Sequence, residues 1–164
     1  MKSKQVSLVT SNAQYTDVLL NWLISATVRS GMPLENIIVI SLDEMLHKLL
    51  TRKAILSVFL PPLSLLNPDA YFSAPFERVM MIRLAVMRII NHLGFDVANY
   101  DTDAIILKDP QPLYSNLSRY DVIGSVGRIP ENLAQEWGIT ICIGVVLLRA
   151  SKRIGKSSIN SVQW

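Results

Sequence analysis

Residues 95–110 read "FDVANYDTDAIILKDP" and place two carboxylates between two apolar runs. The segment Phe95–Tyr100 has the pattern of a buried strand, and residues 104–107 are apolar again. Asp101 and Asp103 lie between them, two positions apart. On an extended chain, side chains two positions apart point the same way, so both carboxylates would face one ligand. The triplet also fits a solvated turn, because Asp commonly forms turns and ends strands.

The flanking sequence alternates between strand and helix patterns. Apolar runs predict buried strands at residues 5–11, 36–41, 54–60 and 95–100. Helical spacing of apolar residues predicts helices at residues 15–26, 42–52 and 73–92. Gly31 and Gly94 are placed to end the first and the last of these helices, and four prolines predict a loop over residues 61–75. Two further strand-like segments follow at residues 120–126 and 139–150.

This alternation predicts an α/β fold with a mostly parallel sheet and helices on both faces, in a single domain over residues 1–164. Ligands of such open sheets bind outside the carboxyl ends of the strands. Two polar clusters fall at such ends, namely residues 10–15 after the first strand and residues 101–103 after the fourth. The sequence therefore predicts ligand binding at these strand ends.

The composition excludes several classes of protein. Half of the 164 residues are hydrophobic and 18% are charged, which excludes a disordered chain. A net charge of +3 with mixed signs does not argue for nucleic acid as a partner. The one cysteine, Cys142, excludes an internal disulfide, and its apolar surroundings predict packing in the core rather than a nucleophile. No stretch has the length of a signal peptide core or a transmembrane span.

Arg83 is out of place on the predicted long helix. On a helical wheel, the polar residues Glu77, Arg78, Arg88, Asn91 and His92 share one arc, whereas Arg83 falls among apolar residues. A guanidinium on an apolar face needs an anionic partner. Arg83 is therefore predicted to snorkel or pair with a structural carboxylate, or else to face a diphosphate or the acidic pair Asp101 and Asp103.

The acidic pair suits a hard cation. Mg²⁺ and Mn²⁺ prefer carboxylate oxygens and often take only one or two from the protein, with water and substrate phosphates completing the shell. A pair of carboxylates at the ligand edge of the sheet, near a cation such as Arg83, is therefore typical of a site for a metal and a diphosphate.

With these features the chain resembles the nucleotide-diphospho-sugar transferase family, whose members are glycosyltransferases with a GT-A fold. It is similar in particular to the plant arabinosyl- and xylosyltransferases of that family. The most characteristic match is "FERVMMIRLAVMRIINHLGFDVANYDTDAIILKDP", residues 76–110, in which a long helix, a Gly and an apolar strand lead into Asp-x-Asp. The other matching segments are "VSLVTSNAQYTDVLLNWLISA", "IIVISLDEMLHKLL" and "ICIGVVLLRAS".

The resemblance implies a donor, a metal and a set of site residues. The donor would be a nucleotide-diphospho-sugar, and the cofactor would be Mn²⁺ or Mg²⁺. The acceptor would be a glycan or a protein. If the chain follows its family, the protein would work in the Golgi lumen. Asp101 and Asp103 would hold the metal, with Asp103 the more direct ligand, while Thr102 and Arg83 would approach the donor. The residues that would line the nucleotide pocket are Thr10, Ser11, Asn12 and Tyr15.

The sequence also departs from the family pattern. Cys142 occupies a position two residues before Gly144 where the family usually has Asn, and by comparison with the family we expect the chain to be shortened at its C-terminal side. An inactive homologue that binds nucleotide or is purely structural is therefore a second hypothesis. A phosphatase of the haloacid-dehalogenase type, with Asp101 as nucleophile, is a third. That family places its Asp-x-Asp near the N-terminus, unlike this chain.

Overall fold

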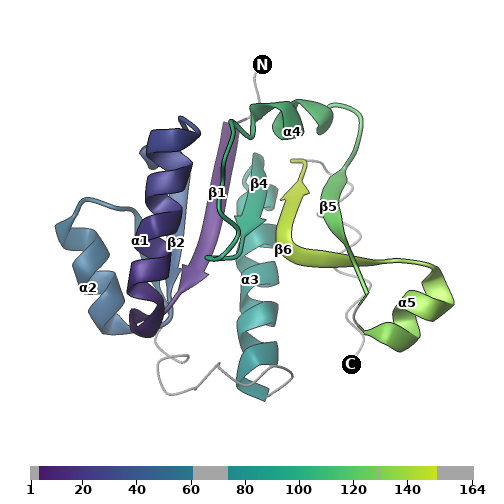
Figure 1. Ribbon diagram of the computed structural model, residues 1–164, viewed down its shortest axis with the longest axis horizontal. Coiled ribbons are helices and arrows are strands. Elements are labelled where there is room, and N and C mark those ends of the chain that lie inside the picture. The colour runs from purple at the N-terminus through teal and green to yellow at the C-terminus, as the bar shows by residue number, and fades with distance from the viewer. Residues whose placement is uncertain (1–3, 61–73, 129, 151–164) are drawn as a thin grey trace.

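The computed structural model describes residues 4–60, 74–128 and 130–150, which form one six-stranded sheet with helices packed against it (Figure 1). The strands are β1 Lys4–Ser11, β2 Ile37–Ser41, β3 Ser57–Phe59, β4 Phe95–Tyr100, β5 Val122–Gly127 and β6 Thr140–Leu148. The α-helices are α1 Thr16–Ile24, α2 Glu44–Arg52, α3 Ala74–His92, α4 Gln111–Asn116 and α5 Glu131–Trp137. Short 3₁₀ or π-helical turns lie at Ala13–Tyr15, Ser25–Arg29 and Leu34–Asn36.

The sheet has the order β3-β2-β1-β4-β6-β5 and is mostly parallel, as predicted. The first four of these strands pair in parallel, and β6 runs antiparallel between β4 and β5. The last apolar run of the sequence contains β6. It forms a half-exposed antiparallel strand, in which Ile141 is 51% exposed while Leu147 is buried.

Helices cover both faces of the parallel part of the sheet. Residues Leu8 and Val9 are both fully buried, but they point to opposite faces and belong to separate apolar clusters. Val9 packs with α1 and α2, through residues that include Trp22 and Leu46, whereas Leu8 packs with α3 around Met87. Burying a side chain of this size contributes roughly 1.5–3 kcal/mol, so β1 is stabilised from both sides.

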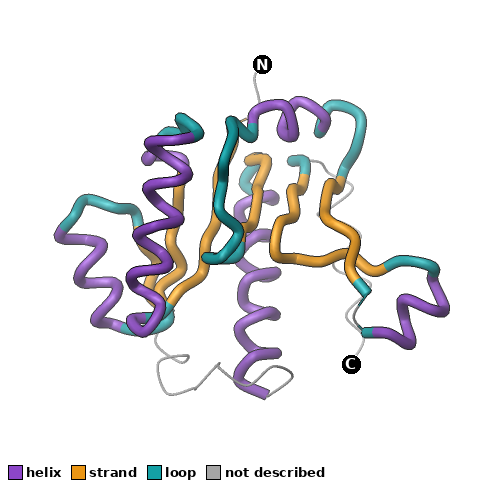
Figure 2. The backbone as a smooth tube through the Cα atoms, in the orientation of Figure 1, coloured by secondary structure: helices purple, strands orange, loops and turns teal. Residues whose placement is uncertain are grey.

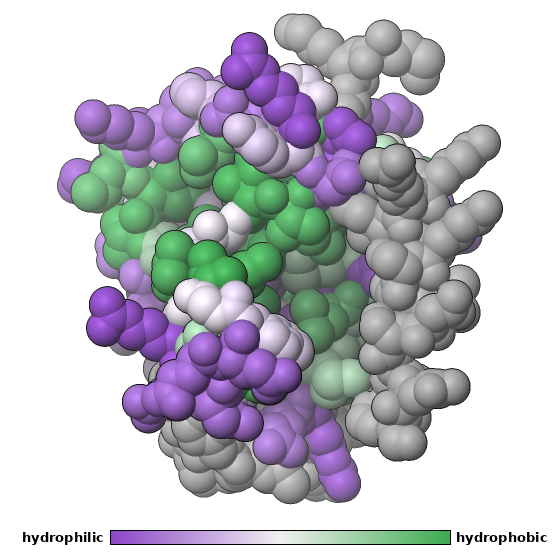
Figure 3. Space-filling view, turned by 90° about the vertical axis from the view of Figure 1, so that its right-hand side faces the viewer, coloured by the Kyte–Doolittle hydropathy of each residue, from purple (hydrophilic) through white to green (hydrophobic). Residues whose placement is uncertain are grey.

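The β5–β6 end of the sheet is covered less than the rest. Figure 2 shows the two strands leading away from the helical layers toward α5. Figure 3, which faces this end of the molecule, shows apolar side chains gathered on its surface. Val126, Trp137 and Ile139 are each at least half exposed here.

The ends of the helices follow the residues that were predicted to set them. Gly31 follows the π-helical extension of α1 and Gly94 follows α3, and both adopt the positive φ that glycine tolerates. The side chain of Asp43 caps α2, because its Oδ1 accepts a hydrogen bond from the backbone N–H of Leu46 at 2.8 Å. The second oxygen of Asp43 accepts a bond from the N–H of Ala13, which ties this helix to the turn after β1.

Some expectations differ from the structure in detail. The third strand covers only Ser57–Phe59 rather than residues 54–60, and the short helices α4 and α5 were not predicted. Six or seven residues are too few for helical periodicity to emerge from a sequence. The predicted loop over residues 61–75 lies largely outside the described residues, although α3 already begins at Ala74. No helix in the described ranges is long and apolar enough to span a membrane.

Replacing Asp43 by Ala should destabilise the protein by about 1–2 kcal/mol, because two backbone donors on different elements lose their acceptor. Chemical denaturation followed by circular dichroism measures this change. Glu44→Ala is the matched control, since Glu44 is the next residue and makes only an exposed ion pair with Lys48. An equal loss in the two variants would contradict the capping role of Asp43.

Candidate functional site

The candidate site lies where the strand order of the sheet reverses. β2 and β3 extend from one side of β1, while β4 lies on its other side. Val9 pairs with Tyr100, so the chain leaves β1 and β4 at neighbouring points on the same edge. Open α/β sheets bind their ligands in the crevice at such a switch point. A cavity of about 460 Å³ opens here, and we call it the switch-point cavity.

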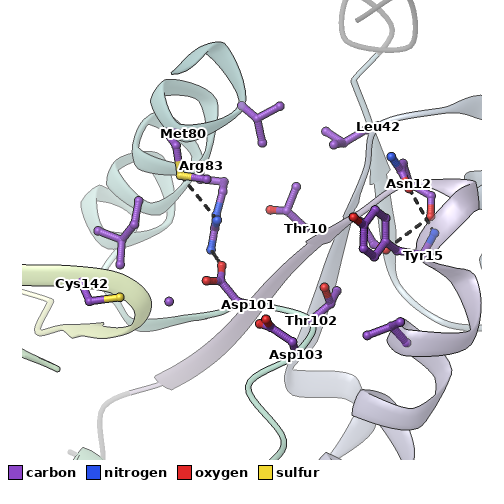
Figure 4. Close-up of a pocket in the computed structure, with 15 residues that line it drawn as sticks. Thr10, Asn12, Tyr15, Leu42, Met80, Arg83, Asp101, Thr102, Asp103 and Cys142 are labelled. Atoms are coloured by element: carbon purple, nitrogen blue, oxygen red, sulfur yellow. Dashed lines mark hydrogen bonds and ion pairs between the residues drawn. The ribbon is translucent and has the colours of Figure 1, made fainter. Parts of the chain in front are cut away.

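All of the residues predicted for binding line the switch-point cavity. They are Thr10, Ser11, Asn12, Tyr15, Arg83, Asp101, Thr102 and Asp103. Figure 4 shows Asn12 and Tyr15 on one side, Arg83, Asp101 and Cys142 on the other, and Thr10 between them. The structure therefore brings the predicted residues together, and their contacts with a ligand remain predictions.

The wall that follows β1 is a short, well-braced turn. The side chain of Asn12 accepts a hydrogen bond from the N–H of Tyr15 at 3.1 Å and so caps the 3₁₀ turn. Asp43 accepts a bond from the N–H of Ala13, and the N–H of Leu42 donates to the carbonyl of Ser11 at 2.9 Å. The hydroxyl of Thr10 is buried without a hydrogen-bond partner in the described part of the chain. Thr10 itself lines the cavity, with its hydroxyl oxygen turned into the protein.

The Asp-Thr-Asp segment is a turn and not an extended chain. The N–H of Ala104 donates to the carbonyl of Asp101 at 3.0 Å, which closes the chain around Thr102 and Asp103. The expectation that the two carboxylates face one ligand because the chain is extended was therefore wrong in its geometry. Both residues still line the cavity.

The chain after this turn is anchored beneath α1. Trp22, which is fully buried, donates from its indole Nε1 to the carbonyl of Ala104 at 3.1 Å. The N–H of Ile106 donates to the hydroxyl of Ser25 at 3.2 Å. The Trp22 ring also packs on Tyr100, whose pKa is raised far above its usual range by burial. These contacts hold the run after the acidic pair without forming a strand; Ile106 is buried, whereas Ile105 and Leu107 are exposed.

Arg83 contacts Asp101, one member of the acidic pair, which was one of the partners predicted for it. Its side chain is only 5% exposed, and its Nη2 donates to Asp101 Oδ1 at 2.5 Å. A buried guanidinium requires such a partner, because an unpaired charge in an apolar setting is strongly unfavourable. The remaining terminal nitrogen, Nη1, contacts the thioether of Met80 at 3.6 Å. Sulfur is a weak acceptor, so Nη1 retains most of its capacity to donate to a ligand.

Asn99 is a residue that the sequence interpretation missed. It is 1% exposed and accepts a hydrogen bond from Arg83 Nε at 3.3 Å. Its amide nitrogen donates to the carbonyl of Ile143 at 2.7 Å, which links α3, β4 and β6. The available signal was the amide itself, because a buried polar side chain inside an apolar strand needs partners.

Gly144 leaves room for the carboxylate of Asp101. The N–H of Asp101 donates to the carbonyl of Gly144 at 2.7 Å, so the two backbones are in close contact. A Cβ atom at position 144 would lie 2.8 Å from Asp101 Oδ2. The glycine is therefore required by a close approach rather than by its φ angle.

Cys142 corrects an expectation. It was predicted to pack in the core, but it is exposed and lines the switch-point cavity. The apolar run around it belongs to the half-exposed strand β6, whose outward residues are apolar without being buried. Cys142 therefore places a thiol on the cavity wall.

The acidic pair fits a divalent cation that the ligand helps to hold. In the described ranges there is no group of three or more His, Cys, Asp or Glu side chains that would enclose a metal. Two carboxylates reach the cavity, and one oxygen of Asp101 is already bonded to Arg83. Oxygen donors of this kind suit Mg²⁺ or Mn²⁺, which keep several coordination positions for water and substrate phosphates. The residues thus fit a cation that shares its shell with a diphosphate.

Comparison with protein-family models gives a match over most of the chain. A model described as nucleotide-diphospho-sugar transferase matches residues 33–159, which is well over half of the chain. No curated protein matches the chain.

Several solved glycosyltransferase structures have a similar fold. Mouse xyloside xylosyltransferase 1 in its apo form aligns with a TM-score of 0.56 and 12% identity, over 94% of this chain and 69% of that protein. The galactosyltransferase LgtC, in complex with donor and acceptor sugar analogues, aligns with a TM-score of 0.52 and 13% identity. The alignment covers 96% of this chain and 66% of LgtC. The glycosyltransferase GlyE of Streptococcus pneumoniae aligns with a TM-score of 0.53 and 16% identity, over 96% of this chain and 37% of GlyE. At these identities the likeness concerns the fold, and it confirms the predicted GT-A architecture. The chain spans about a third to two thirds of their lengths.

Replacing Gly144 by Ala should destabilise the protein by about 1–3 kcal/mol, because the added methyl group overlaps Asp101 Oδ2 while Arg83 holds the other oxygen. Thermal unfolding of the single variants, Gly144→Ala and Asp101→Ala, and of the double variant measures how the two sites are coupled. The penalty of the alanine at 144 should largely disappear when Asp101 is also Ala. A penalty that persists unchanged in the double variant would mean that the clash lies elsewhere.

Proposed function

The chain belongs to the nucleotide-diphospho-sugar transferase family, and we propose that it transfers a sugar from a nucleotide-diphospho-sugar, bound in the switch-point cavity, to a glycan or protein acceptor. The observation that carries this proposal is the meeting of two carboxylates and a buried guanidinium with the polar turn after β1. These groups come from three separate segments of the chain. Their common position is the edge where open α/β sheets bind nucleotides.

The diphosphate of the donor is proposed to lie between Arg83 and the acidic pair. Sugar transfer breaks the bond between the anomeric carbon and the diphosphate, so negative charge builds on the departing nucleoside diphosphate. Arg83 Nη1 would donate to a phosphate oxygen, because its one contact among the described residues is a thioether. A divalent cation, Mn²⁺ or Mg²⁺, held by Asp101 and Asp103, would supply further neutralising charge when bound.

The nucleoside is proposed to lie against the turn after β1. Thr10 lines the cavity next to this turn, and the side chain of Asn12 is held by the capping bond to the N–H of Tyr15. Tyr15 is 45% exposed, which leaves its ring free to stack on a base. The other lining residues on this side, Val18 and Leu42, are apolar and favour a flat aromatic ligand over a fully solvated one.

The first test is calorimetric titration with UDP in the presence of Mn²⁺. The wild-type protein should bind, and Asp103→Ala should lower the affinity about tenfold or more, because it removes an exposed carboxylate of the proposed cation site. Asp109→Ala is the matched control: this nearby carboxylate is exposed but does not line the cavity. Binding that needs no metal and is unchanged in Asp103→Ala would overturn the proposed role of the acidic pair.

Transfer itself requires a separate assay. Turnover of a panel of UDP- and GDP-sugars with Mn²⁺ distinguishes an active transferase from a homologue that only binds nucleotide. Nucleotide binding without hydrolysis or transfer to any acceptor would refute the enzymatic half of the proposal and leave the binding half intact.

Cys142 provides an independent report on occupancy of the cavity. It is the only cysteine in the chain, it is exposed, and it lies on the cavity wall. UDP together with Mn²⁺ should slow the alkylation of Cys142 by iodoacetamide, which mass spectrometry quantifies, because a bound nucleotide restricts access to the thiol. The Asp103→Ala variant should lose most of this protection. An alkylation rate that UDP and Mn²⁺ leave unchanged, under conditions in which calorimetry detects binding, would place the nucleotide elsewhere.

A further inference from the structure

The charges that line the switch-point cavity leave it with little attraction for a free cation. Its lining contains Arg83, Asp101 and Asp103 as the only charged residues among those described, so their formal charges sum to −1. We infer that Arg83 makes cation binding depend on the diphosphate, because it neutralises Asp101 and leaves the phosphates of the donor to supply the negative charge that a cation needs. This inference rests on the proposed function and concerns how its two ligands cooperate.

Arg83 is held against Asp101 and cannot turn away from it easily. Its guanidinium donates to Asp101 Oδ1 through Nη2 and to Asn99 through Nε. Asn99 is in turn bonded to the carbonyl of Ile143, and the side chain of Arg83 is 5% exposed. Leaving this position would expose a buried charge or break two bonds within the protein. The positive charge of Arg83 is therefore a fixed property of the cavity.

This arrangement weakens the cation site in two ways. One oxygen of Asp101 is engaged by Arg83 and is a poorer ligand for a metal. The positive guanidinium also repels any cation that approaches Asp101, at a distance where two charges interact appreciably even in a partly solvated site. Asp103, which is exposed and has no ion pair in the described ranges, is left as the principal anchor for a free cation.

A diphosphate compensates for both effects while Arg83 stays in place. It brings negative charge and phosphate oxygens to the cation, and it gives Arg83 Nη1 a stronger acceptor than the Met80 thioether. A free diphosphate would meet a cavity with a net negative charge, so it also binds better together with the cation. The coupling between the two ligands is then reciprocal, as linkage requires.

The alternative is that Arg83 only joins α3 to β4. In that case replacing it would lower stability, and it would leave the affinity for free cation unchanged or reduced. The electrostatic role makes the opposite prediction for the cation, because removal of the positive charge changes the formal charge of the cavity from −1 to −2. Cation binding in the absence of nucleotide therefore distinguishes the two.

The experiment is a titration of Mn²⁺ into the protein without nucleotide, with free Mn²⁺ followed by its electron paramagnetic resonance signal. Arg83→Gln should bind Mn²⁺ about tenfold more tightly than wild type, and UDP should then raise its Mn²⁺ affinity by a smaller factor. Arg83→Met tests the same point with an apolar stem of similar length, if the glutamine variant is poorly folded. Thermal unfolding verifies that each variant is folded.

Two further variants serve as matched controls. Arg83→Lys keeps the positive charge and should keep the affinity for free Mn²⁺ within about threefold of wild type. Asp101→Asn leaves a formal charge of zero in the cavity and should bind free Mn²⁺ more weakly than wild type.

The outcomes separate this inference from the proposed function. If UDP with Mn²⁺ binds the wild-type protein but Arg83→Gln and Arg83→Met bind free Mn²⁺ no more tightly than wild type, the inference is wrong and the proposed function stands. If UDP binds neither the wild-type protein nor any variant, with or without Mn²⁺, the proposed function fails and the coupling between cation and diphosphate fails with it. Tighter binding of free Mn²⁺ together with a reduced effect of UDP supports both.

Discussion

A guanidinium buried in an apolar setting must meet an anion, and in this protein Arg83 meets Asp101. This ion pair joins the middle of α3 to the end of β4 and orients one carboxylate of the acidic pair. It also explains two of its neighbours. Asn99 accepts a hydrogen bond from Nε of the guanidinium. Gly144 leaves the carboxylate of Asp101 the space that a side chain at position 144 would occupy. The site is thus organised around a charge that cannot be left unpaired.

The topology of the sheet explains why these groups meet the turn after β1. Because β1 lies between β2 and β4, the chain leaves β1 and β4 at adjacent points on one edge. Helices α1 and α2 cover one face of the sheet and α3 covers the other, and the crevice between these two layers remains open. The same reversal of strand order that completes the fold therefore creates the cavity. Family membership and the likeness to solved glycosyltransferases agree with this architecture.

Periodicity predicted the parts of the fold that depend on local sequence. The long helix was expected at residues 73–92 and forms at Ala74–His92, and Gly94 follows it as expected. The predicted burial of Cys142 was wrong, because the last apolar run forms a half-exposed antiparallel strand. An apolar run has no mark of whether its partner strands run with it or against it, nor of what covers its outer face.

The sequence by itself determined which residues stand at the ends of β1 and β4, and that Arg83 is misplaced on an apolar helix face, because both follow from local spacing. Only the tertiary structure decided what these residues contact. Arg83 and Asp101 are 18 positions apart, Asp43 and Ala13 are 30 apart, and Asn99 and Ile143 are 44 apart. Contacts over such separations depend on the order and direction of the strands. The sheet therefore decided that Asp101 carries an ion pair while Asp103 lies open to the cavity.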